Sequence, residues 1–118
     1  MKDVNIVLEA LQKSKFRNSF HLSQKMKDYV KEKGLDTIES HAYDFINSRI
    51  KPKNIKNDGS QTPMRQVHPV FIAQHACACC CRGCILKWHK MPKNRELTSD
   101  EVDYIVKLLL TWIKKECN

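Results

Sequence analysis

The segment from residue 98 to residue 115 constrains the fold more than any other part of the chain. Its first residues, TSDE, place Thr98 and Glu101 at the spacing of a capping box, in which each side chain accepts a hydrogen bond from the other residue's backbone at the start of a helix. The pattern predicts a long amphipathic helix. Its apolar face is formed by Val102, Ile105, Val106, Leu109, Trp112 and Ile113.

Helical patterns recur along the rest of the chain, and no segment alternates strongly between apolar and polar residues as a half-buried strand would. Ser23 and Asp36 are placed to cap two helices, and Gly34 to end the first of them. Pro69 fits the first position of a later helix. The predicted helices cover residues 5–13, 25–33, 37–50, 68–76, 84–90 and 98–115.

A long loop around residues 51–67 interrupts these helices. It contains NDG, which is a turn signal, and Pro63, which disfavours regular structure. The length of 118 residues suits one domain with a modest core. We therefore expect a mainly α fold: a compact single domain, residues 1–118, of five or six helices.

The cysteine-rich segment, residues 75–89, reads HACACCCRGCILKWH and holds five of the six cysteines and two of the five histidines. Within it, Cys81 and Cys84 form a C-x-x-C pair. Two thiolates at this spacing can bind one Zn²⁺ or iron ion, and the intervening glycine lets the backbone turn tightly. The pair predicts a metal site, with Zn²⁺ as the first choice and iron or an iron–sulfur cluster as the alternative.

Further ligands would come from Cys80, His75 or His89. Cys81, Cys84 and His89 have the C-x2-C-x4-H spacing that opens a zinc knuckle, but Asn94 stands where the knuckle's last ligand belongs. A regular helix from Cys84 onward would also turn His89 about 140° away from it. His75 is therefore favoured over His89, although it fits equally well as a hydrogen-bonded core histidine.

Three other interpretations of the same residues remain open. Cys77, Cys81 and Cys84 have a C-x3-C-x2-C spacing that can hold an iron–sulfur cluster. Cys81, at a helix start beside Arg82, could have a lowered pKa and serve as the nucleophile of a thiol redox protein or enzyme, with Cys84 resolving the disulfide. In a purely structural domain acting through protein contacts, the cysteines would be small buried side chains. We expect this last role for Cys77 and Cys79.

The net charge of +8 is concentrated on both sides of the cysteine-rich segment, in residues 49–65 and 82–95. A focused positive field attracts nucleic acid or another polyanion. The alternative is that these lysines and arginines only keep exposed loops soluble. The predicted nucleic-acid contacts are Arg82, Lys87, Lys90 and Lys93 on phosphate, with Trp88 stacked on a base.

No apolar run reaches the roughly 18–20 residues that span a bilayer. The first residues, MKDVNIVLEALQKSKF, also alternate charged and apolar side chains, unlike a signal peptide. We expect a cytoplasmic protein without a membrane partner, in a compartment where thiols are normally reduced.

Several longer motifs, FRNSFHL, DTIESHAYDFI, KNDGSQTPM, HPVFIAQHA, CCRGC and KWHKMPK, together resemble a small bacterial family of uncharacterised domains, over nearly the whole chain. The resemblance implies a stand-alone bacterial protein and brings no established activity. Threonines commonly occupy the places of Cys77 and Cys79 in the family pattern, which weakens the cluster interpretation. What remains is a three-sulfur, one-nitrogen site of Cys80, Cys81, Cys84 and His75, in which two adjacent cysteines would have to bind one metal although neighbouring side chains usually point apart.

Overall fold

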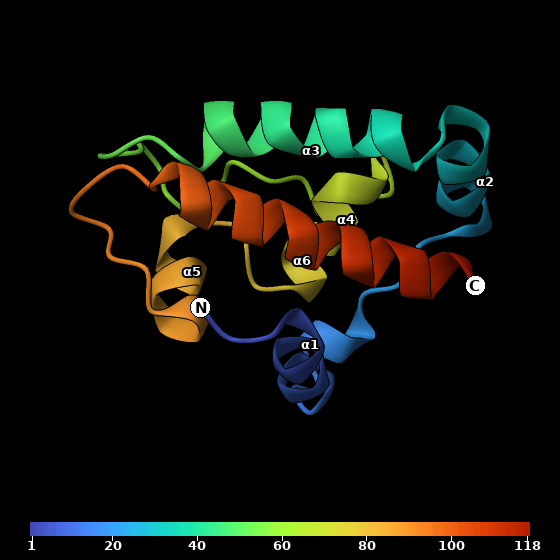
Figure 1. Ribbon diagram of the computed structural model, residues 1–118, viewed down its shortest axis with the longest axis horizontal. Coiled ribbons are helices and arrows are strands. Elements are labelled where there is room, and N and C mark those ends of the chain that lie inside the picture. Colours follow the sequence, from blue (N-terminus) through green and yellow to red (C-terminus); the bar gives the residue numbers. More distant parts are fainter.

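A computed structural model describes residues 1–118 and contains six α-helices, one short 3₁₀ helix and no strand (Figure 1). The molecule measures 38 × 28 × 24 Å, which confirms the prediction of a compact, mainly α fold. None of the helices combines the length and the apolar character that a bilayer-spanning segment needs. The elements are α1 (Val4–Gln12), η1 (Arg17–Ser19), α2 (Gln24–Lys33), α3 (Leu35–Arg49), α4 (Pro69–Ala76), α5 (Arg82–His89) and α6 (Ser99–Cys117).

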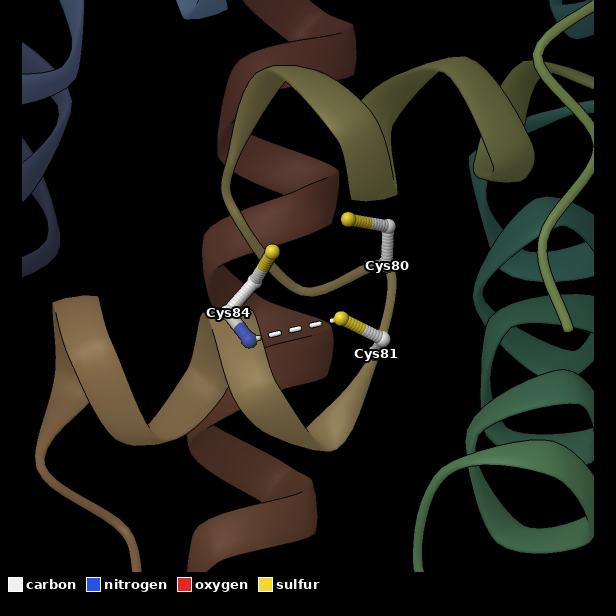
Figure 2. Close-up of side chains that lie close together, drawn as sticks. All are labelled: Cys80, Cys81 and Cys84. Carbon is white, nitrogen blue, oxygen red and sulfur yellow. Dashed lines mark hydrogen bonds between the residues drawn. The ribbon is translucent and has the colours of Figure 1, made fainter. Parts of the chain in front are cut away.

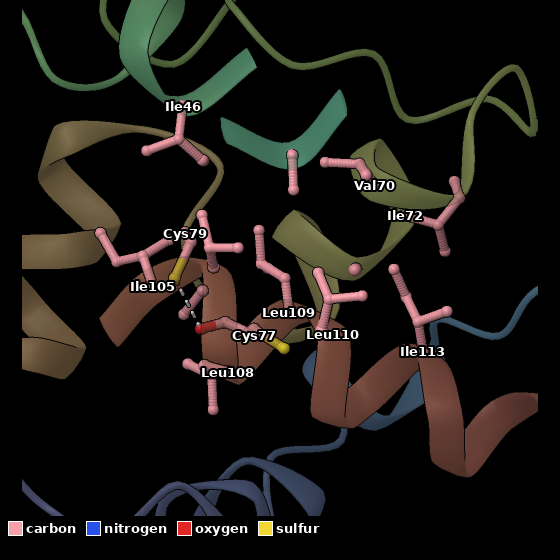
Figure 3. Packing of buried hydrophobic residues seen from close by; sticks show 14 of the residues in the cluster. Ile46, Val70, Ile72, Cys77, Cys79, Ile105, Leu108, Leu109, Leu110 and Ile113 are labelled. Carbon is pink, nitrogen blue, oxygen red and sulfur yellow. Dashed lines mark hydrogen bonds between the residues drawn. The ribbon is translucent and has the colours of Figure 1, made fainter. Parts of the chain in front are cut away.

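Helix α6 is the central element of the fold, with α3 on one side and α1 on the other (Figure 1). It begins with the predicted capping box, in which Thr98 Oγ1 accepts from Glu101 N at 3.1 Å and Glu101 Oε1 accepts from Thr98 N at 2.8 Å. Its apolar face meets side chains of α3, α4 and the segment after α4 in one hydrophobic core (Figure 3). The buried residues of α6 are Val102, Ile105, Val106, Leu108, Leu109, Leu110 and Ile113.

The predicted start of α3 was wrong by two positions. The helix begins at Leu35, directly after Gly34, so Asp36 lies in its first turn and does not cap it. Gly34 ends α2 and precedes α3 at a φ of +85°, which a residue with a side chain rarely adopts. The chain therefore passes from α2 to α3 through one glycine, and no residue is left between the helices to cap α3 with its side chain.

Helix α4 begins with Pro69 in its first position, as predicted. Its cap was not predicted: the ring Nδ1 of His68 accepts a hydrogen bond from Val70 N at 3.0 Å. The predicted loop is irregular throughout residues 51–67. Thr62 is nevertheless buried within it, which places the middle of the loop against the core.

We expect the capping box to make stability sensitive to acid. Hydrogen bonds from Arg95, at 2.7 and 2.9 Å, hold the pKa of Glu101 at about 2, against an ordinary value of 4.5. A carboxyl with a lowered folded-state pKa stabilises the fold above its unfolded pKa and loses that contribution as the pH falls toward the folded value. The melting temperature of the wild-type protein should therefore fall between about pH 4.5 and pH 2.

The Glu101→Gln variant should show a smaller fall over the same window, because it has no carboxyl to protonate. Glu96→Gln is the matched control, since Glu96 is exposed and its side chain makes no hydrogen bond. Thermal unfolding followed by circular dichroism across this pH range gives the comparison. An acid dependence of Glu101→Gln equal to that of the wild type would contradict the assignment.

Candidate metal centre

A turn joins α4 to α5, and five of the six cysteines lie in and just after it. Helix α4 ends at Ala76, so Cys77 and Cys79 are not helical. Ala78 takes a φ of +58°, a left-handed conformation that an alanine rarely adopts without support from its surroundings. That support includes Gln74, whose carbonyl oxygen accepts from Cys79 N at 2.7 Å and whose Nε2 donates to Cys79 O at 3.1 Å.

Cys77 and Cys79 are buried side chains of the core, as predicted. Both have 0% exposure and lie among apolar residues of α6 (Figure 3). Burial raises the pKa of each thiol. They are therefore small apolar contacts between the turn and α6, and neither sulfur belongs to the group described next.

Cys80, Cys81 and Cys84, here called the cysteine triad, bring their sulfur atoms together within 4.8 Å of one another (Figure 2). Sulfurs that share one tetrahedral Zn²⁺ lie about 3.8 Å apart, given a Zn–S distance of about 2.3 Å. The adjacent residues Cys80 and Cys81 both contribute because the backbone of Cys81 is extended at the N-cap of α5 and the first helical turn brings Cys84 back toward them. Cys81 Sγ accepts a hydrogen bond from Cys84 N at 3.3 Å. The triad could thus hold one metal ion.

Neither of the two predicted histidine ligands lies in this sulfur group. His75 is buried, donates from Nε2 to Thr62 O at 3.0 Å, and stacks on Phe20. His89 donates from Nε2 to Cys77 O at 2.8 Å. It also shares the regular helix α5 with Cys84, the geometry that turns the two side chains apart. Each imidazole therefore supports the backbone of the turn or of the loop that covers it.

Arg17, which the sequence did not single out, contacts two sulfurs of the triad. Its side chain is buried, and Nη2 lies 3.1 Å from Cys84 Sγ while Nη1 lies 3.6 Å from Cys80 Sγ. Nη1 also donates to His75 O at 2.8 Å. Arg17 forms no ion pair with a carboxylate, so the sulfurs are the only groups beside it that can carry a balancing negative charge. Burial lowers the pKa of Arg17, but the hydrogen bonds with Cys80 and Cys84 outweigh this effect and raise it.

The predicted nucleophile of the redox hypothesis does not have the expected acidity. Cys81 caps α5 and precedes Arg82, which was expected to lower its pKa. Burial instead raises the pKa of Cys81 to about 12. The guanidinium of Arg82 bonds to backbone carbonyl oxygens and not to the Cys81 sulfur. Without a metal ion, Cys81 is therefore a protonated thiol at neutral pH.

The prediction that Arg82 contacts phosphate was also wrong. Its side chain is 2% exposed, and its guanidinium donates to five backbone carbonyl oxygens at 2.6–3.2 Å. These oxygens belong to two chain segments on either side of α5. They are the carbonyl oxygens of Ile50, Lys51, Pro52, Pro92 and Arg95.

The other predicted nucleic-acid contacts, Lys87, Trp88, Lys90 and Lys93, differ in exposure and in contacts. Lys87 and Lys90 are exposed, and the ammonium group of Lys90 donates to Lys87 O at 3.1 Å. Lys93 forms an ion pair with Asp58 at 3.5 Å. Trp88 is half-buried and packs against the core. Only the positive charge of Lys87, Lys90 and Lys93 therefore supports a polyanionic partner.

The long loop holds the cysteine turn from outside. Asp58 accepts hydrogen bonds from Arg82 N at 2.9 Å and Gly83 N at 3.0 Å, at the positive end of α5. Thr62 Oγ1 donates to Cys80 O at 2.8 Å. Two residues of a segment predicted only to be irregular thus hold the backbone of Cys80 and of the two residues between Cys81 and Cys84.

We predict that Arg82→Lys destabilises the protein although it keeps the charge. An ammonium group has only three donors, so at least two of the five carbonyl oxygens lose a partner, at a cost of roughly 3 kcal/mol in the free energy of unfolding. Urea unfolding measures the difference. Arg65→Lys, at an exposed position, should change it by less than about 0.5 kcal/mol, and an equally small effect at Arg82 would show that the carbonyl contacts are unimportant.

Comparison with known proteins places the chain in a family without assigning it an activity. No solved structure matches the chain. Residues 5–114 match the family described as a domain of unknown function, DUF4186. The matched part of the chain includes the turn, the triad and the residues around it. The chain belongs to this family of domains of unknown function.

Proposed function

We propose that this chain is a metal-binding protein in which Cys80, Cys81 and Cys84 hold one Zn²⁺ ion. The observation behind the proposal is the placement of three sulfurs within 4.8 Å of one another beside a buried arginine that has no carboxylate partner. Cysteine thiolates are preferred ligands of Zn²⁺. The proposal also implies a reducing location such as the cytoplasm, because the thiols must stay free of disulfide bonds.

Charge balance supports a divalent ion. Three thiolates and one divalent cation carry a net charge of −1, and Arg17 contributes +1 at two of the sulfurs. A monovalent ion would leave a net negative charge in this buried place, and a trivalent ion a net positive one, and burying an unbalanced charge is costly. Arg17 therefore fits the needs of a three-thiolate site with Zn²⁺ or another divalent thiophilic ion.

The geometry favours a single ion over an iron–sulfur cluster. In a [4Fe–4S] cluster each cysteine binds a different iron, which requires wider sulfur spacing than a shared ion does. The C-x3-C-x2-C interpretation also needs Cys77, which is fully buried and lies outside the sulfur group. One ion bound by Cys80, Cys81 and Cys84 satisfies the spacing without rearranging the core.

The site has three protein ligands and no fourth in the group. Structural zinc sites are usually closed by four protein ligands, whereas sites with three keep a position for water or substrate. We therefore propose an open centre, whose fourth position is taken by a small exogenous ligand. The residues of this chain that support it are Arg17 by its charge, and Asp58 and Thr62 by their bonds to the backbone.

Elemental analysis of anaerobically purified, untagged protein tests the proposal. We expect about one zinc per chain in the wild type, and none in Cys81→Ser, because a serine hydroxyl is a poor zinc ligand at neutral pH. Cys117→Ser is the matched control, since Cys117 is exposed near the end of α6 and lies outside the triad, and it should keep its zinc. Zinc retained by Cys81→Ser, or no uptake when zinc is added to metal-free wild type, would overturn the site.

The Arg17→Gln variant tests the charge argument with the same protein preparation. Removing the positive charge should weaken zinc binding by about 10–100-fold, the usual effect of removing a group that contacts metal ligands. Competition with a chelating dye measures the affinity. Arg65→Gln removes an exposed positive charge and should bind zinc as the wild type does. Equal affinities for both variants would show that Arg17 does not balance the charge of the centre.

A further inference from the structure

We propose that Cys84 is the oxidation site of the cysteine triad: a hydroperoxide oxidises its sulfur, the sulfur then forms a disulfide with Cys81, and the metal ion is released. The metal-release part rests on the proposed metal centre. The thiol chemistry rests on the arrangement of Arg17, Cys81 and Cys84 and needs no metal.

Accessibility distinguishes Cys84 from the other two cysteines of the triad. Cys80 and Cys81 are 8% and 9% exposed, whereas Cys84 is only partly buried. A small oxidant from solvent therefore reaches the sulfur of Cys84 first. Cys117 is exposed as well, but it has no second thiol near it with which to form a disulfide within the chain.

Arg17 is placed to assist a reaction at this sulfur. Its Nη2 lies 3.1 Å from Cys84 Sγ, and the guanidinium is held in position by a second bond from Nη1 to His75 O at 2.8 Å. A fixed positive group beside the reacting sulfur stabilises negative charge on that sulfur and on the oxygen that leaves the peroxide. Lys27 acts on Cys117 only through its charge, without a hydrogen bond to the sulfur.

Cys81 is the second thiol of the reaction. Its sulfur lies within 4.8 Å of Cys84 Sγ and contacts the backbone N–H of Cys84 at 3.3 Å. The two residues are three positions apart across the first turn of α5, where rotation of the side chains can bring the sulfurs to bonding distance. Cys81 does not need access to solvent, because it reacts only with Cys84.

In the metal-free chain the chemistry takes place in two steps; in the zinc-loaded chain, where the metal holds thiolates, water supplies the two protons that the same steps need. First, Cys84 Sγ attacks one peroxide oxygen; an S–O bond forms, the O–O bond breaks, and the released oxygen takes the proton of the Cys84 thiol, which leaves a sulfenic acid and an alcohol, or water from hydrogen peroxide. Second, Cys81 Sγ attacks Cys84 Sγ; the S–S bond forms, the S–O bond breaks, and the departing hydroxide takes the Cys81 proton to give water. Two thiols are oxidised by two electrons and one hydroperoxide is reduced.

Disulfide formation removes two of the three thiolates that the proposed metal centre uses. The remaining sulfur, Cys80, cannot hold Zn²⁺ alone in a protein that offers no other ligand in the group. Oxidation of the triad and loss of the metal should therefore occur together, with one equivalent of zinc released for each disulfide.

The experiment treats two preparations of the full chain, metal-free and zinc-loaded, with equimolar hydrogen peroxide. Peptide mass mapping identifies the disulfide, and a chelating dye measures released zinc. We expect a Cys81–Cys84 disulfide in both preparations and, in the second, one zinc released per disulfide. Cys117→Ser should behave as the wild type, Cys84→Ser should form no disulfide, and Cys81→Ser should accumulate a sulfenic acid at Cys84 that a dimedone-type reagent traps.

Arg17→Gln provides a variant that keeps all three thiols. Its disulfide should form at least about tenfold more slowly than in the wild type, because the stabilising charge is gone.

A disulfide that forms through Cys80 at the wild-type rate in Cys84→Ser, or no disulfide in the metal-free wild type, would overturn the assignment of Cys84. If the wild type forms the disulfide but fails to take up zinc when zinc is added, only the metal centre is overturned. If it binds zinc but forms no disulfide, only the oxidation proposal is overturned.

Discussion

The position of the cysteine triad depends first on the buried guanidinium of Arg82. This side chain stands between two of the cysteines in sequence and donates to five carbonyl oxygens before and after α5. A buried charge of this kind is tolerated only when its donors are almost all used, and that requirement fixes the start of the helix relative to both segments. Cys81 and Cys84, at the first turn of α5, are fixed with it.

The triad is also the place where distant parts of the chain meet. Arg17 reaches it from η1, Asp58 and Thr62 from the long loop, and Gln74 from α4. Each of these residues contacts a backbone or sulfur atom of residues 79–84, and each lies in the part of the chain that matches the family. A small helical domain that only needed a core would not require this concentration of polar contacts on one turn. The arrangement fits a site whose sulfur atoms must keep a fixed geometry.

Local patterns predicted most of the fold, while the surroundings of the site required the structure. The capping box at Thr98 and the C-x-x-C pair are short-range signals, and both lie where the sequence placed them. The role of Arg17 depends on a contact across more than sixty residues of chain, which no spacing reveals. The burial of Arg82 was missed for the same reason. Its partners are backbone carbonyl oxygens, which every residue has, so the sequence does not distinguish it from an exposed arginine in a basic segment.

X-ray absorption spectroscopy at the zinc edge of the zinc-loaded protein tests the metal centre most directly, because it counts the sulfur ligands. The open three-thiolate centre predicts three sulfurs at about 2.3 Å and one lighter atom at about 2.0–2.1 Å. Cys80→Ser, like Cys81→Ser, should hold no zinc, so the three-sulfur signal should be absent. A first shell made only of nitrogen and oxygen, or one with a single sulfur, would contradict a metal centre formed by Cys80, Cys81 and Cys84.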